Sequence, residues 1–373
     1  MSYILLTWLL APIWWPISIL RARRQTVPQR ILIAEIAGIG DVVCSTAVFK
    51  AVRAAFPDVH IALMVDTVLK SLASQDTNLN EVVPFAYGAQ RGFSGRWKLM
   101  RLMSSFDTVI CLIPSAGQLT AACWAATPRR YSVLPDIPVT SYRWLSPLMT
   151  HVLAHESNTS FVGTQLRLLT PLGVRGNPEN RSLCITDASR MKANALLAGG
   201  STWIGLAIGS GQGIKAIAPQ VLKTVIFELL KNPRFVIVLI GGGKEQGLAA
   251  KLMSDIEVSH RVRCFDETGK WPLDELPGLL VKLDCFIGVD SGVTYMADTL
   301  AIPLVYLPGP ANPADQTPIR SRKIVLQKNL DCAPCSRVFV TPDHCAAKDH
   351  ACIDAISAQE IVDAVNALLK KAP

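Results

Sequence analysis

Strand-length apolar runs alternate with helical patterns along most of the chain, and this alternation constrains the fold more than any other feature. One series of runs reads RILIAEIAG, HIALMVD and DTVICLIPS, and a later series reads TWIGLAIGSG, RFVIVLIGGG, DCFIGVDSG and PLVYLPGP. Runs that are apolar throughout predict strands buried on both faces, and helices between such strands predict a parallel, doubly wound sheet. The sequence therefore predicts an α/β fold.

The two series fit into 373 residues as two domains of ordinary size. Residues 172–184, LGVRGNPENRSLC, lie between the series and are rich in Gly, Pro, Asn and charge, which is typical of a connection between domains. We expect a Rossmann-like N-terminal domain over residues 29–178 and a Rossmann-like C-terminal domain over residues 179–373. The carboxyl ends of the strands in both domains are expected to face a common cleft.

The chain begins with an uncharged apolar segment. Residues 3–20 read YILLTWLLAPIWWPISIL, and the basic residues that follow are Arg21, Arg23, Arg24 and Arg30. A secretory signal would carry its charge before the apolar run, so we do not expect export. The segment is barely long enough to cross a bilayer and contains Pro12 and Pro16, so a spanning helix and an interfacial anchor both stay open. We interpret residues 1–28 as an anchor at the cytoplasmic face of the inner membrane; the alternative is a buried core helix.

The net charge of +8 indicates an anionic partner, either a membrane surface or a phosphorylated substrate. Nucleic acid is the rival interpretation of such a charge. The sequence contains no recognition helix, zinc-finger spacing or aromatic RNA-binding motif, so we expect no nucleic-acid partner.

The first apolar run is followed by the turn Gly38-Ile39-Gly40 and then by Asp41. A dinucleotide fingerprint would have glycine at position 43, where this chain has Val43, and no anion where the phosphates bind. Asp41 would repel a pyrophosphate. We interpret it as a functional carboxylate at the first turn of a helix, and the alternative is a residue that only caps that helix.

Three motifs of the second series have the composition of a phosphate and sugar site. GSGQGIK contains Ser210 and Lys215, which can contact a phosphate, although the motif is not a Walker loop and can also be a plain loop. GGGKEQ contains Glu245, a carboxylate suited to ribose hydroxyls. In GVDSGVT, Asp290 ends a strand and can bind sugar hydroxyls or cap a helix. The helix N-terminus that would hold a diphosphate follows it and consists of Ser291, Gly292, Val293 and Thr294.

The ten cysteines fall into two groups. Six lie singly in apolar runs and are most simply core residues in a reducing compartment: Cys44, Cys111, Cys123, Cys184, Cys264 and Cys285. The other four, Cys332, Cys335, Cys345 and Cys352, lie close to two histidines. Their spacing permits a zinc site, two disulfides or reduced thiols, and we assign no metal.

The order of these motifs, together with ETGKWPLDEL and GPANP, resembles the heptosyltransferases, family 9 of the glycosyltransferases, from about residue 30 to 369. This resemblance implies a GT-B architecture of two Rossmann-like domains. It also implies an enzyme that moves a heptose, with inversion, from an ADP-activated donor to a lipid-linked core sugar of lipopolysaccharide. The donor is a substrate, and no further cofactor is implied. Lys215 and the helix that starts at Ser291 would stabilise the leaving diphosphate, so a metal is dispensable.

The resemblance also implies a role for each matching residue. Asp41 matches the general base, Lys215 with Ser210 the phosphate contacts, Glu245 the ribose contact, Asp290 the donor-sugar contact, Ser291 to Thr294 the diphosphate cradle, and Trp271 the position where adenine packs. Two positions depart from the family pattern. Tyr295 stands where the family usually has histidine, and KAIAP replaces a Lys-x-Trp-Pro run.

These departures leave alternative functions open. They are transfer of another nucleotide sugar in surface polysaccharide synthesis, a sugar-nucleotide epimerase or hydrolase on a similar fold, and a catalytically silent scaffold. On the acceptor side, residues 91–103, RGFSGRWKLMRLM, form a basic amphipathic stretch that meets lipid phosphates or is an ordinary solvated helix. Residues 142–149, YRWLSPLM, are a second candidate contact with the acceptor or the membrane.

Overall fold

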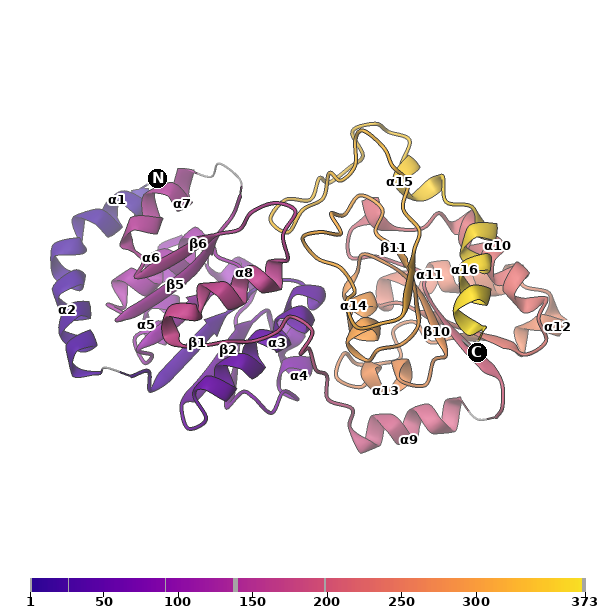
Figure 1. Cartoon of the computed structure of the whole chain (residues 1–373), viewed down its shortest axis with the longest axis horizontal. Helices are drawn as coiled ribbons and strands as arrows, with labels where there is room; N and C mark the ends of the chain where they lie inside the picture. The colour runs from indigo at the N-terminus through magenta and orange to yellow at the C-terminus, as the bar shows by residue number, and fades with distance from the viewer. Residues whose placement is uncertain (1, 26, 91, 137–139, 198, 371–373) are drawn as a thin grey trace. The chain divides into compact units, whose positions relative to one another are not determined.

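The computed structural model describes all residues except 1, 26, 91, 137–139, 198 and 371–373 (Figure 1). The chain divides into two compact units, Met1–Arg181 and Ser182–Pro373. The sequence pattern predicted the boundary after residue 178, and residues 1–28, predicted as a separate segment, belong to the first unit.

The first unit contains a six-stranded parallel sheet in the order β3-β2-β1-β4-β5-β6. Its strands are β1 Arg30–Ala34, β2 His60–Val65, β3 Glu81–Pro84, β4 Thr108–Cys111, β5 Arg129–Leu134 and β6 His151–Ala154. The chain builds outward from β1 to β3 and then crosses to β4 on the other side of β1. This reversal makes the carboxyl ends of β1 and β4 the topological switch point, where doubly wound sheets bind ligands.

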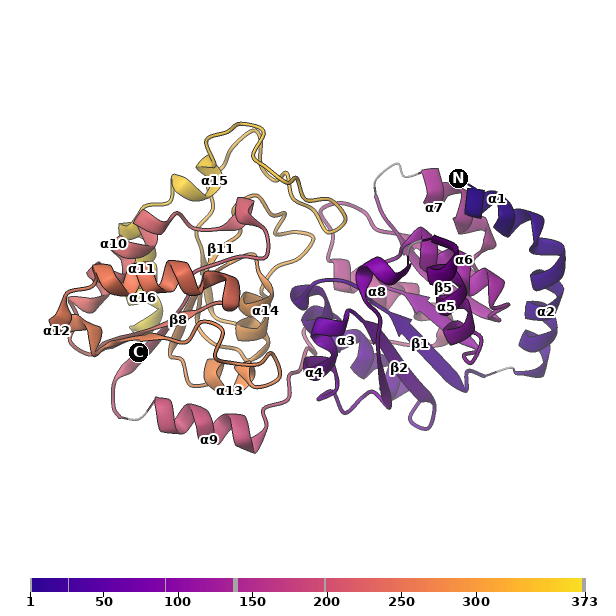
Figure 2. The ribbon, with the colours of Figure 1, turned by 180° about the vertical axis from the view of Figure 1, so that it is seen from behind.

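Helices lie on both faces of this sheet (Figures 1 and 2). They are α1 Ser2–Leu9, α2 Ala11–Arg24, α3 Ile39–Ala55, α4 Lys70–Ala73, α5 Gly92–Met103, α6 Ala116–Trp124, α7 Thr140–Leu145 and α8 Phe161–Leu168, with short 3-10 helices η1 Thr67–Leu69, η2 Tyr87–Gln90, η3 Ser146–Leu148 and η4 Thr170–Leu172. Ser115 caps the N-terminus of α6: its hydroxyl accepts from the Gln118 amide, and the Gln118 side chain accepts from the Ser115 amide.

The second unit contains a six-stranded parallel sheet in the order β12-β11-β10-β7-β8-β9. Its strands are β7 Thr202–Ala207, β8 Phe235–Ile240, β9 Cys264–Asp266, β10 Cys285–Val289, β11 Leu304–Leu307 and β12 Lys323–Val325. Here the reversal lies between β7 and β10. The expected α/β fold with two parallel sheets is confirmed.

The helices of the second unit again cover both faces of its sheet (Figures 1 and 2). They are α9 Asp187–Leu196, α10 Pro219–Leu230, α11 Gln246–Asp255, α12 Val258–Arg261, α13 Leu276–Leu280, α14 Gly292–Thr299, α15 Ala351–Asp354 and α16 Ala358–Leu369, with η5 Gly213–Lys215 and η6 Gly243–Glu245. The C-terminal α16 packs against α10 because Ile361, Val365 and Leu368, at helical spacing, are buried on one side.

The apolar N-terminal segment folds as α1 and α2, which meet at an angle of 61°. Within the described residues no single helix is long and apolar enough to cross a membrane, although α1 and α2 together meet that criterion by length and composition. Trp14 of α2 is buried in the core of the first unit.

Candidate functional site

In the second unit, Lys215 and Asp290 meet at the topological switch point. Lys215 ends η5 in the loop that follows β7, and Asp290 comes directly after the neighbouring strand β10. The Lys215 Nζ lies 2.6 Å from Asp290 Oδ2, and the two side chains are only 12% and 13% exposed. The structure thus joins two residues that the sequence assigned separately to a phosphate and a sugar.

The second oxygen of Asp290 faces two tyrosines. The Tyr295 hydroxyl, from α14, donates to Asp290 Oδ1 at 2.5 Å and also lies 3.2 Å from the Gln316 carbonyl. The Tyr306 hydroxyl, from β11, lies 3.4 Å from the same carboxylate oxygen. Contacts on both oxygens fix the orientation of the Asp290 carboxylate. Tyr295 was identified in the sequence as a departure from histidine, and its partner is now known.

The N-terminus of α14 lies beside this carboxylate. Ser291 is the N-cap residue, and within the described residues no side-chain hydrogen bond caps the helix. Its hydroxyl lies 3.1 Å from Thr294 Oγ1 instead. The first-turn amides, which have no partner inside a helix, are thus suited to an anion. A close approach also fixes this turn, because a Cβ at Gly288 would come 2.3 Å from Thr294 Oγ1.

Glu245 is held between the loops that follow β7 and β8. Its Oε2 accepts a hydrogen bond from the Gly242 amide at 2.8 Å. Its side chain lies against Gly209, where a Cβ would come 2.3 Å from Glu245 Cγ. The Ser210 hydroxyl accepts from the Gln212 amide at 3.3 Å and so shapes the loop that leads to Lys215. Glycine at position 209 is therefore required for the contact between the two loops.

Trp271 is largely buried, with 8% of its surface exposed. Its indole Nε1 donates to Glu267 Oε2 at 2.8 Å, and Lys192 Nζ lies 4.1 Å from the ring centroid. One face of the indole therefore already has a cationic partner. Packing of adenine against Trp271 stays a prediction.

In the first unit, Asp41 lies in the first turn of α3, beside the switch point between β1 and β4. Its Oδ2 accepts from the Gly38 amide at 3.1 Å, so the carboxylate stabilises the start of the helix. This contact corresponds to the capping alternative, and it is compatible with a second role for the same carboxylate. The role of Asp41 as a general base stays a prediction.

Glu35, which no sequence motif singled out, comes directly after β1 and is completely buried. The Ser45 hydroxyl lies 2.6 Å from Glu35 Oε1 and 3.1 Å from Gln165 Oε1. Burial raises the pKa of the Glu35 carboxyl to about 8, with a smaller contribution from the negative charge of Asp41, whereas the Ser45 and Gln165 contacts lower it. The available signal was a single acidic residue inside the apolar run RILIAEIAG.

The four late cysteines line one small cavity of about 40 Å3, together with Ile214 and Pro310. None of these four cysteines forms a disulfide, and burial together with the neighbouring thiols raises the pKa of Cys335 and Cys352. In the described part of the chain, no group of three or more His, Cys, Asp or Glu side chains is arranged to hold a metal ion.

Comparison with known proteins gives consistent matches. Residues 224–342 match the family model described as glycosyltransferase family 9 (heptosyltransferase). The chain is 24% identical over 314 residues to lipopolysaccharide heptosyltransferase 2 of Salmonella typhimurium (strain LT2), an alignment that covers 79% of this chain and 86% of that protein.

Two solved structures are also similar. The family 9 glycosyltransferase of Veillonella parvula DSM 2008 has a TM-score of 0.75 and 21% identity, covering 92% of this chain and 98% of that chain. The ADP-heptose lps heptosyltransferase II of E. coli has a TM-score of 0.72 and 18% identity, covering 91% and 98%. The resemblance to heptosyltransferases is confirmed, and the two-sheet fold matches these structures.

Proposed function

We propose that this chain, whose second unit carries a glycosyltransferase family 9 domain, transfers a heptose-type sugar from an ADP-activated donor to a lipid-linked core saccharide. The observation that carries the proposal is the Lys215–Asp290 pair at the switch point beside the N-terminus of α14. A cation, a helix N-terminus and a fixed carboxylate are the groups that a sugar diphosphate needs.

The donor side follows from charge. Lys215 and the first turn of α14 bind the diphosphate and stabilise the negative charge that develops as it leaves. Asp290, whose orientation Tyr295 fixes, accepts hydrogen bonds from hydroxyls of the donor sugar. Because a lysine and a helix N-terminus supply the positive charge, transfer is proposed to need no metal ion. The choice of ADP-heptose is supported by the description of the similar E. coli protein as an ADP-heptose lps heptosyltransferase.

The remaining roles are those that the resemblance to the family 9 glycosyltransferases implies. Glu245 and Ser210 contact the ribose and the phosphates, and Trp271 packs against the adenine. Asp41 acts as general base: it takes the proton of the acceptor hydroxyl as that oxygen forms a bond to the anomeric carbon. The bond from the anomeric carbon to the diphosphate oxygen breaks on the opposite side, which inverts the anomeric configuration.

The acceptor determines where the reaction takes place. A lipid-linked core saccharide is embedded in a membrane, so we place the enzyme at the cytoplasmic face of the inner membrane. The exposed apolar side chains of α1 and α2, for example Leu9 and Ile13, support this location.

The donor assignment is tested by calorimetric titration of the full-length protein with ADP, UDP, GDP and NAD. We expect ADP to bind most tightly and Lys215→Ala to weaken ADP binding about tenfold or more. Lys223→Ala is the matched control, since Lys223 is an exposed lysine of the same unit in an ion pair with Asp255. Tighter binding of UDP or GDP would overturn the heptose assignment, and tight NAD binding that ignores Lys215 would overturn the whole proposal.

The catalytic assignment is tested with Asp41→Asn, which keeps the shape of the side chain and removes the base. We expect turnover with ADP-heptose and a lipid-linked core-saccharide acceptor to fall at least about 100-fold. ADP affinity should stay unchanged, as in the exposed-site control Asp58→Asn. Full turnover in Asp41→Asn would refute the role of Asp41 as base.

Tyr295 favours a second candidate, transfer of a different nucleotide-activated sugar. A phenol hydroxyl that donates to Asp290 places a bulkier aromatic group at the donor-sugar contact than histidine would. Turnover of another ADP-sugar in preference to ADP-heptose would favour this candidate.

A further inference from the structure

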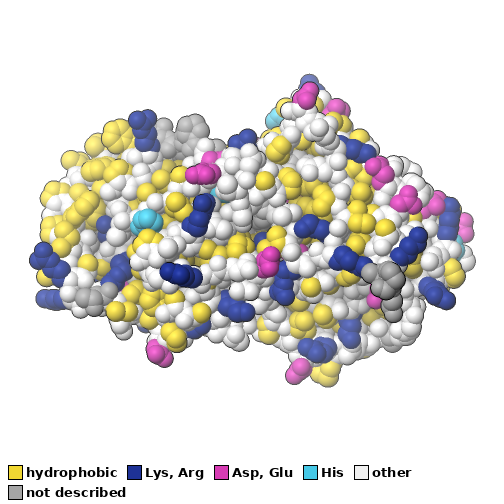
Figure 3. Space-filling model, viewed as in Figure 1, with side chains coloured by type: hydrophobic (Ala, Val, Ile, Leu, Met, Phe, Trp, Pro, Cys, Tyr) yellow, Lys and Arg dark blue, Asp and Glu magenta, His cyan; other side chains and the backbone are white. Residues whose placement is uncertain are grey.

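The outer side of the N-terminal helices carries a stripe of exposed apolar side chains. Leu5 and Leu9 on α1 and Ile13, Ile17 and Leu20 on α2 are each between 48% and 67% exposed. They recur every three or four residues through the bend between the helices, so they lie along one side. In Figure 3, hydrophobic side chains gather over α1 and α2 at the left of the view, with Lys and Arg side chains at the margin.

Two other helices extend this stripe. Phe93 and Trp97 of α5 and Trp144 of α7 are about half exposed. The Trp8 indole donates to the Trp144 carbonyl at 3.0 Å, which joins α1 to α7. The Arg96 guanidinium lies 4.1 Å from the Tyr3 ring centroid, which joins α5 to α1. We call the exposed apolar side chains of α1, α2, α5 and α7 the apolar platform.

The segments that form the apolar platform contain no acidic residue. Residues 1–34, 82–106 and 137–155 include no Asp or Glu, and they do include several Lys and Arg. Arg23 and Arg24 at the end of α2 are exposed. The platform therefore combines a tryptophan-rich apolar stripe with positive charge only, which complements an anionic lipid surface.

The inner side of α1 and α2 is fixed to the first unit. Trp14 is 3% exposed, and the Arg130 guanidinium lies 5.2 Å from its ring centroid. Arg21 donates to the carbonyls of Ala125 at 3.0 Å and Phe106 at 3.3 Å.

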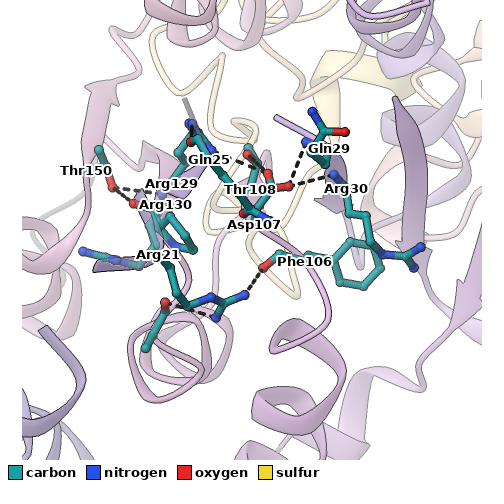
Figure 4. A network of polar contacts seen from close by, with 12 residues as sticks. Arg21, Gln25, Gln29, Arg30, Phe106, Asp107, Thr108, Arg129, Arg130 and Thr150 are labelled. Carbon is teal, nitrogen blue, oxygen red and sulfur yellow. Dashed lines mark hydrogen bonds and ion pairs between the residues drawn. The ribbon is translucent and has the colours of Figure 1, made fainter. Parts of the chain in front are cut away.

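The chain that follows α2 is fixed as well. Asp107 accepts from the amides of Gln29 and Arg30 at 2.7 and 2.9 Å (Figure 4). The two helices thus pack as part of the unit, and only their outer side is available to a partner.

We propose that the apolar platform lies in the headgroup region of an anionic bilayer, with α1 and α2 parallel to the membrane plane. A second copy of this chain is a poor occupant, because it would place the same arginines opposite one another without a carboxylate between them. A bilayer accepts the stripe, the tryptophans and the arginines together. This docking rests on the membrane location proposed above, which depends on the same helices. It requires no donor chemistry, so it can fail while the proposed sugar transfer stands, and the reverse.

The test measures binding of the full-length protein to vesicles of phosphatidylcholine alone and of phosphatidylcholine with 30% phosphatidylglycerol. We expect binding to the anionic vesicles that falls more than about tenfold in Ile13→Asp/Ile17→Asp. The matched control is Val258→Asp/Val262→Asp, since these valines of the second unit are each 76% exposed and have the same spacing. Arg23→Gln/Arg24→Gln should reduce the preference for the anionic vesicles several-fold. The far-UV circular dichroism spectrum and the urea-unfolding midpoint should be the same in all variants, which shows that each is folded.

Several outcomes would overturn the proposal. One is absence of vesicle binding, and another is equal binding by Ile13→Asp/Ile17→Asp and the valine control. Resistance of the vesicle-bound protein to alkaline carbonate extraction would show a spanning segment instead of an interfacial one. A stable dimer that Ile13→Asp/Ile17→Asp dissociates would show that the platform is an interface between copies.

Discussion

Glu35 permits a quantitative prediction about the first unit. Its carboxyl is completely buried, and the Ser45 hydroxyl, which has a single proton, lies 2.6 Å from Glu35 Oε1 and 3.1 Å from Gln165 Oε1. A protonated Glu35 is compatible with both contacts, because it can donate to Ser45 while Ser45 donates to Gln165. Glu35→Gln keeps the shape of the side chain and removes the ionisation, so it isolates the free energy that protonation costs.

The magnitude follows from the raised pKa. In the unfolded chain the carboxyl titrates near its ordinary value of 4.5, whereas burial raises the pKa in the folded protein to about 8. Between these values the folded state holds one more proton than the unfolded state, so the free energy of unfolding falls as pH rises, by about 1.4 kcal/mol per pH unit. From pH 5 to pH 7 the loss is about 3 kcal/mol, and Glu35→Gln should not show it.

The assay is urea unfolding of the full chain at pH 5 and pH 7. Unfolding is monitored by hydrogen exchange in peptides that contain β1 and α3. The difference in unfolding free energy between Glu35→Gln and the parent should shift by about 3 kcal/mol in favour of the variant over this interval. Glu156→Gln, at an exposed position of the same unit, should show no such shift. Parallel pH dependence in the parent and in Glu35→Gln would refute a neutral Glu35.

Other predictions concern the site itself. Ionisation of Glu35 above about pH 8 places a second negative charge near Asp41, so Glu35→Gln should change the alkaline part of the pH–turnover profile. Identical profiles in the variant and the parent would show that the two carboxylates act independently. Tyr295→Phe removes the 2.5 Å hydrogen bond to Asp290. In steady-state kinetics this variant should have a kcat/KM about 10-fold lower, with ADP affinity retained. An unchanged kcat/KM would show that this bond does not position Asp290. Gly209→Ala places a methyl group 2.3 Å from Glu245 Cγ and should weaken ADP binding in calorimetry. The control is Gly211→Ala, where a Cβ has nothing within 4 Å. Equal ADP affinities in the two variants would refute the need for the close approach at Gly209.

Local sequence pattern was sufficient for the central strands of both sheets and for the residues of the candidate site. Apolar runs that alternate with helical patterns predicted both parallel sheets, because burial on two faces leaves a continuous apolar signal. The glycine-containing turns after those runs identified Lys215, Glu245 and Asp290, because ligands bind at the carboxyl ends of parallel strands.

Partners distant in the sequence required the tertiary structure. Lys215 and Asp290 are 75 positions apart, and they pair because β7 and β10 are neighbours in the sheet, an order that the crossover connection determines. Glu35 looks like any acidic residue in the sequence, and only the packing of α3 and α8 around it removes it from water. In the same way, α1, α5 and α7 are separate stretches along the chain. Side-chain contacts between these helices join them into one surface, because a local pattern specifies which side of a helix is apolar but not which helices will lie beside it.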